Sequence, residues 1–237
     1  MRNCRRLTAA LRTAGFTLVE LAVALAIVGL LLGMLIVPLS TQVDQQRIGD
    51  TQRLLDLIRE AVIGFAVANG RLPCPATPTT PNTTAGAGTE NRVGTACGVP
   101  EGVLPWATLG LPETDSWNNR FTYRVTLSFA DDPVAGLLAS FALTDNGDIT
   151  INNGVINGSI TVASTIPAIF VSHGKNGFGA YRRDGSQVTG AAADELQNAN
   201  MTTTFVSRIP SPDFDDLIGW VSPNVLKARM VAANRLP

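Results

Sequence analysis

The longest uniform feature of the chain is an apolar stretch near its N-terminus. No charged side chain occurs between positions 21 and 39, and a helix over the 24 residues from 16 to 39 measures about 36 Å. The hydrocarbon core of a bilayer is about 30 Å thick. Segment 16–39 is therefore predicted to be a single transmembrane helix.

After position 39 the apolar pattern becomes periodic. Apolar side chains recur three, four or seven positions apart, with charged side chains between them, which predicts an amphipathic helix over residues 40–69. Pro38 bends a helix rather than forbidding it, so this helix continues the membrane segment. Gly70 and Pro73 supply a C-terminal stop. The apolar side chains form a stripe along one face of this helix, at Ile48, Leu55, Ile58, Val62 and Phe65. The alternative is that this stripe packs against a coiled-coil partner.

Residues 70–237 have the pattern of a folded head. The stretch 72–105 is rich in Pro, Thr, Gly and Asn and is typical of a long loop. Apolar residues alternate from Phe121 to Phe129, which predicts a half-buried strand. Ser222 and Pro223 predict the start of a short closing helix. Further apolar runs lie at 137–143, 160–163, 168–171 and 205–209, with turns at Asn146-Gly147, Asn153-Gly154 and Asn157-Gly158.

These patterns together predict an α+β protein. One long N-terminal helix, transmembrane over its first half and amphipathic over its second, packs its apolar stripe on an antiparallel sheet. The head is long enough to bury a core of its own.

Charge adds an orientation to this picture. The first fifteen residues hold four arginines and no acid, and this excess before segment 16–39 predicts a cytoplasmic N-terminus. A conventional signal peptide is the alternative, but the exit at Pro38-Leu39-Ser40 lacks a small-residue cleavage pattern. Without residues 1–15 the chain has 14 basic and 19 acidic side chains, so its charge falls from -1 to near -5. Nucleic acid is an unlikely partner for such a chain, because phosphate contacts need a basic surface.

One carboxylate interrupts the apolar stretch, and the residues around it are distinctive. Glu20 lies where burial in a membrane costs roughly 2.5 to 3.5 kcal/mol at the bilayer centre and less near its surface. The segment Gly15-Phe16-Thr17-Leu18-Val19-Glu20 closely resembles the processing site of type IV prepilins. The alternative is an ordinary anchor whose carboxylate reaches the headgroups.

The resemblance implies a pilin-like fold and a specific maturation. Prepilin peptidase is expected to remove the leader, residues 1–15, by cutting between Gly15 and Phe16, and to methylate the new N-terminus at Phe16. Glu20 is expected to neutralise the N-terminal amine of a neighbouring subunit, which also sets subunit register. The implied partners are other pilin or pseudopilin subunits, the peptidase, an inner-membrane assembly platform and membrane lipid.

The cysteines fit the same topology. Cys4 lies in the leader, so the mature chain keeps only Cys74 and Cys97, on the oxidising side of the bacterial inner membrane. We expect them to form a disulfide that closes the long loop and contributes about 3 kcal/mol. The alternative is that both cysteines are free thiols. A metal site is less favoured, because two cysteines without nearby histidines supply only half of the four ligands of a zinc site.

Three segments of the head resemble type II secretion pseudopilins. Asp115–Tyr123 is similar to their aspartate-x-tryptophan-glycine-asparagine segment, with Asn118 in place of the glycine, and Ser172–Gly177 is similar to a serine-and-glycine turn. A late acidic loop also resembles theirs. Clustered carboxylates suit a hard cation, so Asp213, Asp215 and Asp216 are candidate ligands for a calcium ion.

No catalytic constellation is apparent in the sequence. Ser172 and His173 are adjacent at the end of a predicted strand, so their side chains point to opposite faces and cannot act as nucleophile and base on each other. His173 is the only histidine, and Gly174–Gly177 lacks the spacing of a phosphate-binding loop. Two functions remain. The first is a structural subunit, expected to be a minor one, of a pilus, pseudopilus or competence filament. The second is a membrane-anchored periplasmic binding module that does not polymerise.

Overall fold

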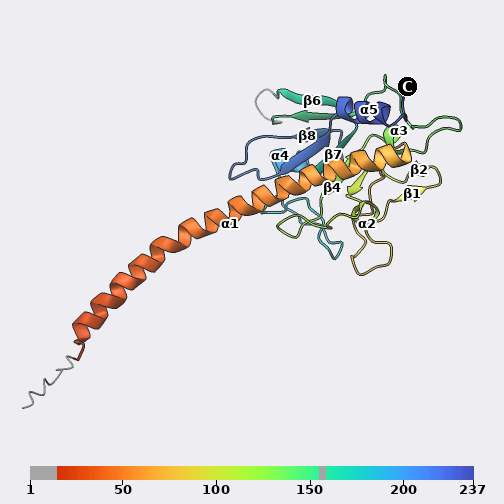
Figure 1. Cartoon of the computed structure of the whole chain (residues 1–237). Helices are drawn as coiled ribbons and strands as arrows, with labels where there is room; N and C mark the ends of the chain where they lie inside the picture. The colour runs from red at the N-terminus through yellow and green to blue at the C-terminus, as the bar shows by residue number, and fades with distance from the viewer. Residues whose placement is uncertain (1–14, 155–158) are drawn as a thin grey trace, which may run out of the picture. The chain divides into compact units, whose positions relative to one another are not determined.

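The structure is a computed structural model that describes residues 15–154 and 159–237, apart from the side chains of residues 32–40. The chain divides into two compact units, one reaching Gln46 and the other running from Arg47 to Pro237. Its first element, α1 (Leu18–Asn69), contributes residues to both units (Figure 1). We call the second unit the head.

The N-terminal unit consists of the first part of α1 and the short segment before it. Every described side chain from residue 15 to residue 31 is exposed, including Phe16 at 85%. Within the described ranges, no helix combines the length and the apolar character needed to cross a membrane. The predicted span 16–39 includes side chains 32–40, which lie outside the described residues, and it stays a prediction. The predicted leader 1–15 lies almost wholly outside them.

The head contains a four-stranded antiparallel sheet. Its strand order is β3-β4-β7-β9, with β4 paired to β7 from Thr122↔Val171 to Val125↔Ala168. A two-stranded ribbon precedes this sheet, and short helices lie in the connections. The bounds of the ribbon are β1 Arg92–Val93 and β2 Ala96–Cys97; those of the sheet are β3 Glu101–Val103, β4 Thr122–Val125, β7 Ala168–Ser172 and β9 Leu217–Val221; the first two short helices are α2 Trp106–Leu109 and α3 Leu127–Ala130.

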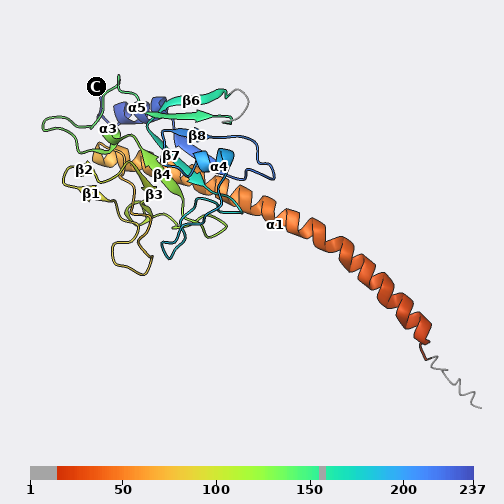
Figure 2. The same ribbon diagram turned by 180° about the vertical axis from the view of Figure 1, so that it is seen from behind.

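The main core of the head lies between the later turns of α1 and this sheet. Leu55, Ile58 and Val62 are buried there, as the apolar stripe predicts, and Tyr123 and Phe170 meet them from the strands. Figures 1 and 2 show these turns of α1 running along β4 and β7. The helix ends at Asn69 because Gly70 takes a left-handed φ of +75°.

A smaller sheet covers the other face of the large one. It has the strand order β6-β5-β8 and includes one parallel pair, β5 with β8, so the expectation of purely antiparallel strands is wrong here. Its inward side chains, Ile149, Ile151 and Phe205, form a second core with Ile169 and Val171 of β7. The remaining elements are β5 Ile149–Asn152, β6 Thr161–Ile166, α4 Ala193–Gln197, β8 Thr204–Val206 and α5 Pro223–Ala232.

The long loop 72–105 is held in place by a disulfide and by a buried guanidinium group. Cys74 and Cys97 are joined, as the sequence predicts, with their Cα atoms 5.3 Å apart. Arg120 is 0% exposed and donates hydrogen bonds to the carbonyl oxygens of Pro78 and Thr80, each at 2.9 Å. It also donates to the carbonyl oxygen of Arg183 at 3.0 Å, which joins this loop to a later one.

Two predicted elements of the head differ from the structure. The alternating segment 121–129 is a strand only over β4, because the next residue, Thr126, lies opposite Pro167, which has no amide to donate in return, and the chain then turns into α3. The apolar run 137–143 forms no strand, although Phe141 within it is buried and stacks on Phe129. The predicted closing helix is confirmed as α5, but its Ser222 side chain makes no capping hydrogen bond.

Candidate functional site

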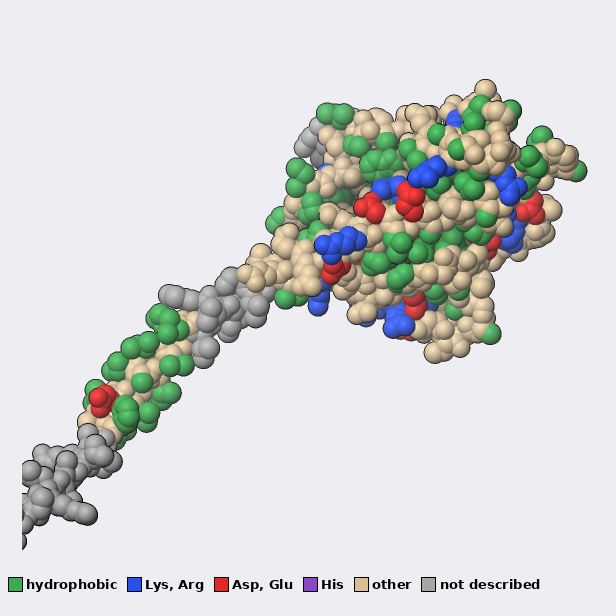
Figure 3. Space-filling view, in the orientation of Figure 1, with side chains coloured by type: hydrophobic (Ala, Val, Ile, Leu, Met, Phe, Trp, Pro, Cys, Tyr) green, Lys and Arg blue, Asp and Glu red, His purple; other side chains and the backbone are tan. Residues whose placement is uncertain are grey.

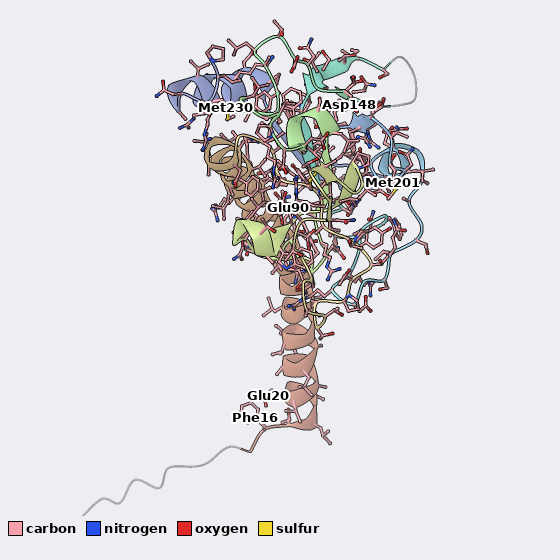
Figure 4. The ribbon with its side chains drawn as sticks, turned by 90° about the vertical axis from the view of Figure 1, so that its right-hand side faces the viewer. Phe16, Glu20, Glu90, Asp148, Met201 and Met230 are labelled. Carbon is pink, nitrogen blue, oxygen red and sulfur yellow. A yellow bond between two sulfur atoms is a disulfide. The ribbon has the colours of Figure 1, made fainter. Side chains whose placement is uncertain are left out.

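The predicted processing segment lies at the start of α1. Gly15, Phe16 and Thr17 precede the first helical residue, Leu18, and all three are exposed. Figure 4 shows Phe16 and Glu20 close to each other at this end of the helix. Exposure leaves the peptide bond between Gly15 and Phe16 open to an external enzyme.

Glu20 takes part in a reciprocal hydrogen-bonding arrangement with Thr17. The Thr17 amide and hydroxyl each donate to Oε2 of Glu20 at 3.2 Å, and the Glu20 amide donates to Oγ1 of Thr17 at 3.2 Å. This is a capping box, with Thr17 as N-cap and Glu20 at the third helical position. The box satisfies amide groups that the first turn of a helix leaves without partners.

The surroundings of Glu20 are otherwise apolar. Leu18, Val19 and Leu21 are all more than half exposed, and Figure 3 shows hydrophobic side chains over the first turns of α1. A carboxylate in such a place is also favoured by the positive end of the helix dipole. Helix capping therefore accounts for part of what holds Glu20 there. In the described part of this unit, the apolar side chains around Glu20 belong to no buried cluster.

A second cluster of carboxylates lies in the head. Glu195 of α4 and the consecutive pair Asp215 and Asp216 before β9 each bring one oxygen within 4.8 Å of the others. Asn176 organises two of them, because its side-chain amide donates to Oε1 of Glu195 at 2.7 Å and its backbone amide donates to Oδ2 of Asp215 at 2.9 Å. Asn198 donates to Oδ2 of Asp216 at 2.7 Å.

Burial and mutual repulsion act on this cluster. Burial raises the pKa of Asp215, and the neighbouring charge of Asp216 raises it further. The pKa of Glu195 is raised by burial and then by the charges of Asp216 and Asp215. Oδ1 of Asp215 and Oδ1 of Asp216 are buried and accept no hydrogen bond within the described part of the chain. Three carboxylates with two such oxygens are a donor set that fits a hard divalent cation.

The predicted calcium ligands are thus only partly brought together. Asp215 and Asp216 lie in the cluster, whereas Asp213 accepts hydrogen bonds from the Ser211 hydroxyl at 2.6 Å and from Nη2 of Arg208 at 3.0 Å. The Ser211 hydrogen bond, and then Arg208, lower the pKa of Asp213. Asp213 is therefore already paired with the guanidinium group of Arg208. Glu195 is the third carboxylate of the cluster, in the place predicted for Asp213.

Ser172 and His173 have different partners in the structure. The Ser172 hydroxyl donates to Oδ2 of Asp115 at 2.6 Å, and Nε2 of His173 lies 2.8 Å from Oγ1 of Thr122. Both residues are fully buried. These contacts tie β7 to β4 and to the segment before it, which is a structural arrangement.

Three residues of these sites were missed from the sequence. Thr17 could have been found, because the T-x-x-E pattern before an apolar run is a capping signature. Glu195 lies twenty residues before Asp215, and no local pattern connects them. Arg120 lies within the Asp115–Tyr123 segment, but its burial was not predicted, because most arginines are exposed and no local pattern marks a buried one.

The comparisons with known proteins address the N-terminal segment. A family model described as the prokaryotic N-terminal methylation motif matches residues 11–36. Neither a curated protein nor a solved structure matches the chain. The motif is that of a structural family and not of an enzyme family. With Gly15, Phe16 and Glu20 inside the matched segment, the chain thus carries at residues 11–36 the prepilin-type signal of type IV pilins and pseudopilins.

Proposed function

We propose that the chain is a structural subunit, and a minor one, of a type IV pilus or a type II secretion pseudopilus. Prepilin peptidase cleaves it after Gly15 and methylates Phe16, and the N-terminal helix then carries it into a filament. The observation that supports this most is Glu20, a carboxylate in the first turn of an apolar helix that bears the methylation motif. A head with a long disulfide-closed loop favours a minor subunit over a major one.

The role of Glu20 follows from the chemistry of a buried charge. Cleavage creates a new amine at Phe16, and the same amine exists in every neighbouring subunit. Opposite charges attract strongly in a medium of low dielectric constant, but they offset their desolvation only at close range. An amine–carboxylate pair between subunits therefore fixes the register of one helix against the next.

The proposed location follows from the same segment. Residues 16–39 cross the bacterial inner membrane once, with the leader in the cytoplasm and residues 70–237, which make up most of the head, in the periplasm. Lipid and the assembly platform surround the helix before assembly, and other pilin or pseudopilin subunits surround it afterwards. The apolar side chains exposed at residues 16–31 support this exchange of surroundings.

The head is proposed to bind calcium through Glu195, Asp215 and Asp216. The buried Oδ1 of Asp215, which accepts no hydrogen bond within the described part of the chain, supports this, because a cation supplies a partner for it; Oδ1 of Asp216 lies 3.7 Å from Nδ1 of His173. When bound, the ion ties α4 to the segment before β9 and so adds to the stability of the head.

The maturation step is tested on the protein isolated from membranes. N-terminal sequencing and intact-mass measurement are expected to find a chain that begins at methylated Phe16. A Gly15→Leu variant serves as the control, since a bulky residue before the scissile bond is expected to leave Met1 in place. A wild-type N-terminus at Met1, or one beyond Leu39, would overturn the proposed function.

A further inference from the structure

A hollow with a positive charge lies on the surface of the head. It has a volume of about 440 Å³ and is lined by three segments, at residues 117–119, 175–176 and 182–184. Its charged side chains are the basic Lys175, Arg182 and Arg183 and the acidic Asp184, so three positive charges and one negative charge give it a formal charge of +2. We call it the basic hollow. Its charge suits an anionic ligand.

Within the described residues, the guanidinium group of Arg182 has no partner. The other eight arginines from residue 70 onward each form a hydrogen bond or an ion pair with another part of the head. Arg182 is exposed. Arg183 is only partly matched in charge, because its Nε donates to Oε2 of Glu113 at 2.9 Å while the same carboxylate also pairs with Arg120. An anion bound in the basic hollow would supply the acceptor that these two neighbouring groups lack.

The backbone around the basic hollow is held in place before any ligand binds. Oδ1 of the buried Asp115 accepts hydrogen bonds from the amides of Trp117 and Asn119, at 2.9 and 3.0 Å. The later segment is joined to this one, because the Arg120 amide donates to the carbonyl oxygen of Tyr181 at 2.8 Å. A ligand therefore binds with little further loss of backbone freedom.

The other side chains of the basic hollow distinguish among anions. Asn118 is exposed with a φ of +65°, and its side-chain amide offers both donors and an acceptor. Hydrogen bonds from the hydroxyl and then the amide of Ser186 lower the pKa of Asp184, so this exposed carboxylate stays ionised and repels a free phosphate. Trp117 packs partly against the main core and also lines the hollow, which adds an apolar ring to its wall. A ring with one carboxylate and several hydroxyl groups matches all three.

We propose that the basic hollow binds an acidic sugar, a pyranose ring that carries one carboxylate. The carboxylate accepts hydrogen bonds from Arg182 and Arg183, whose planar groups suit its two oxygens. The hydroxyl groups bond with the Asn118 amide and donate to Asp184, and the ring rests on Trp117. This inference goes beyond the proposed filament subunit and depends neither on cleavage nor on assembly.

The test measures the binding of galacturonate to the full-length protein in detergent, by ligand-observed NMR titration. Galactose, which has the same ring without the carboxylate, and inorganic phosphate, which has charge without a ring, are the matched probes. Galacturonate is expected to bind with a Kd of about 1 mM, typical of so small a ligand, and each matched probe at least about tenfold more weakly. A galacturonate trisaccharide separates the two sources of the sugar: tighter binding than the monomer indicates a polymer, and equal binding indicates a single sugar unit.

Three variants locate the ligand in the basic hollow. Arg182→Ala is expected to weaken galacturonate binding about tenfold because it removes a charged donor, and Arg182→Lys, which keeps the charge without the planar group, is expected to lose less. Asn118→Gly, which adopts the left-handed backbone freely, is expected to weaken the binding of both galacturonate and galactose. The control is Arg229→Ala, which removes an exposed arginine of α5 and is expected to leave the Kd unchanged. An unchanged unfolding midpoint confirms that each variant is folded.

Three results would contradict the proposal. They are the lack of saturable galacturonate binding, phosphate binding as tight as that of galacturonate, and equal losses of affinity in Arg182→Ala and Arg229→Ala. The second result would indicate a simple anion site, and the third a general effect of charge.

Discussion

The N-terminal unit and the head differ in where their apolar side chains find partners. In the head, Leu55, Ile58 and Val62 of α1 are buried against strands of the same chain. In the N-terminal unit, Phe16, Leu18 and their neighbours on the same helix are exposed. The apolar side chains of α1 are therefore buried in the head and exposed in the described part of the N-terminal unit.

The ionisable groups follow the same division. In the head, the buried Arg120 forms an ion pair with Glu113 at 2.9 Å. Among the described residues, the hydrogen bonds to the Glu20 carboxylate come from Thr17, three positions before it. A change in the head is thus expected to alter folding, whereas a change at Glu20 is expected to alter association.

The largest effect is expected at Glu20. Glu20→Ala should leave the chain cleaved and folded but exclude it from filaments, since removing one partner of a buried ion pair costs roughly 3 to 5 kcal/mol. Sheared filaments and the membrane pool are compared by immunoblot, with an unchanged membrane pool as the sign of normal folding.

Glu20→Gln separates charge from capping. Glutamine keeps an acceptor for the Thr17 amide but has no charge. If charge matters, Glu20→Gln fails as Glu20→Ala does; if only Glu20→Ala fails, capping is the role of Glu20. Normal incorporation of both variants would show that assembly does not need Glu20.

Loss of the disulfide is expected to have the next largest effect, and within the head. Cys74→Ser combined with Cys97→Ser should lower the free energy of unfolding by about 3 kcal/mol, because the loop it closes regains its freedom in the unfolded chain. Denaturant unfolding followed by tryptophan fluorescence measures this, since all three tryptophans lie in the head. Wild-type protein treated with a reductant should match the variant, and a loss below about 1 kcal/mol would show that other contacts order the loop.

A buried glutamate gives the head a dependence on pH. Burial raises the pKa of Glu101 to about 7 from 4.5, although Arg124 opposes the shift. The folded head therefore holds this proton more tightly than the unfolded chain, and the stabilisation present below pH 4.5 is lost as the pH rises to 7. Glu101→Gln should gain up to about 3 kcal/mol relative to wild type across that range, at about 1.36 kcal/mol per pKa unit.

Unfolding midpoints at pH 4.5 and 7.5 measure this difference. Glu60→Gln, an exposed glutamate on α1, is the control for loss of a charge. The same difference between wild type and Glu101→Gln at both pH values would contradict the assignment.

Calcium is expected to have the smallest effect. Millimolar calcium should add about 1 kcal/mol to the stability of the head if the site binds as weakly as other extracellular modules, which raises Tm by about 2 to 4 °C. Asp215→Asn should abolish the rise, whereas Asp213→Asn should retain it, because Asp213 is directed to Arg208. A rise that Asp213→Asn removes and Asp215→Asn does not would place the ion elsewhere.

The features predicted correctly from the sequence are the local ones, and those that depend on distant residues were missed. Local signals, such as the periodic stripe on α1, the stop at Gly70 and the start of α5 at Pro223, gave correct elements because each depends on neighbouring residues. The strand predicted beyond Val125 is wrong because its pairing partner there, from a distant segment, is Pro167, which cannot donate a hydrogen bond to the ladder.

The candidate sites divide in the same way. Gly15, Phe16 and Glu20 form a contiguous motif, and a family model matches the segment that contains them. The carboxylate cluster depends on Glu195, which folding brings beside Asp215 from a distant segment.

The guanidinium group of Arg120 also determines where the head can be altered for experiments. Because it binds carbonyl oxygens at Pro78, Thr80 and Arg183, the surface loops at 78–80 and 183 are fixed to each other through the interior. An epitope tag or fluorescent label inserted at either place would separate backbone groups that one buried side chain holds together. The exposed turn around Gly136, which makes no such contact with Arg120, is a more suitable attachment point for imaging the protein in cells.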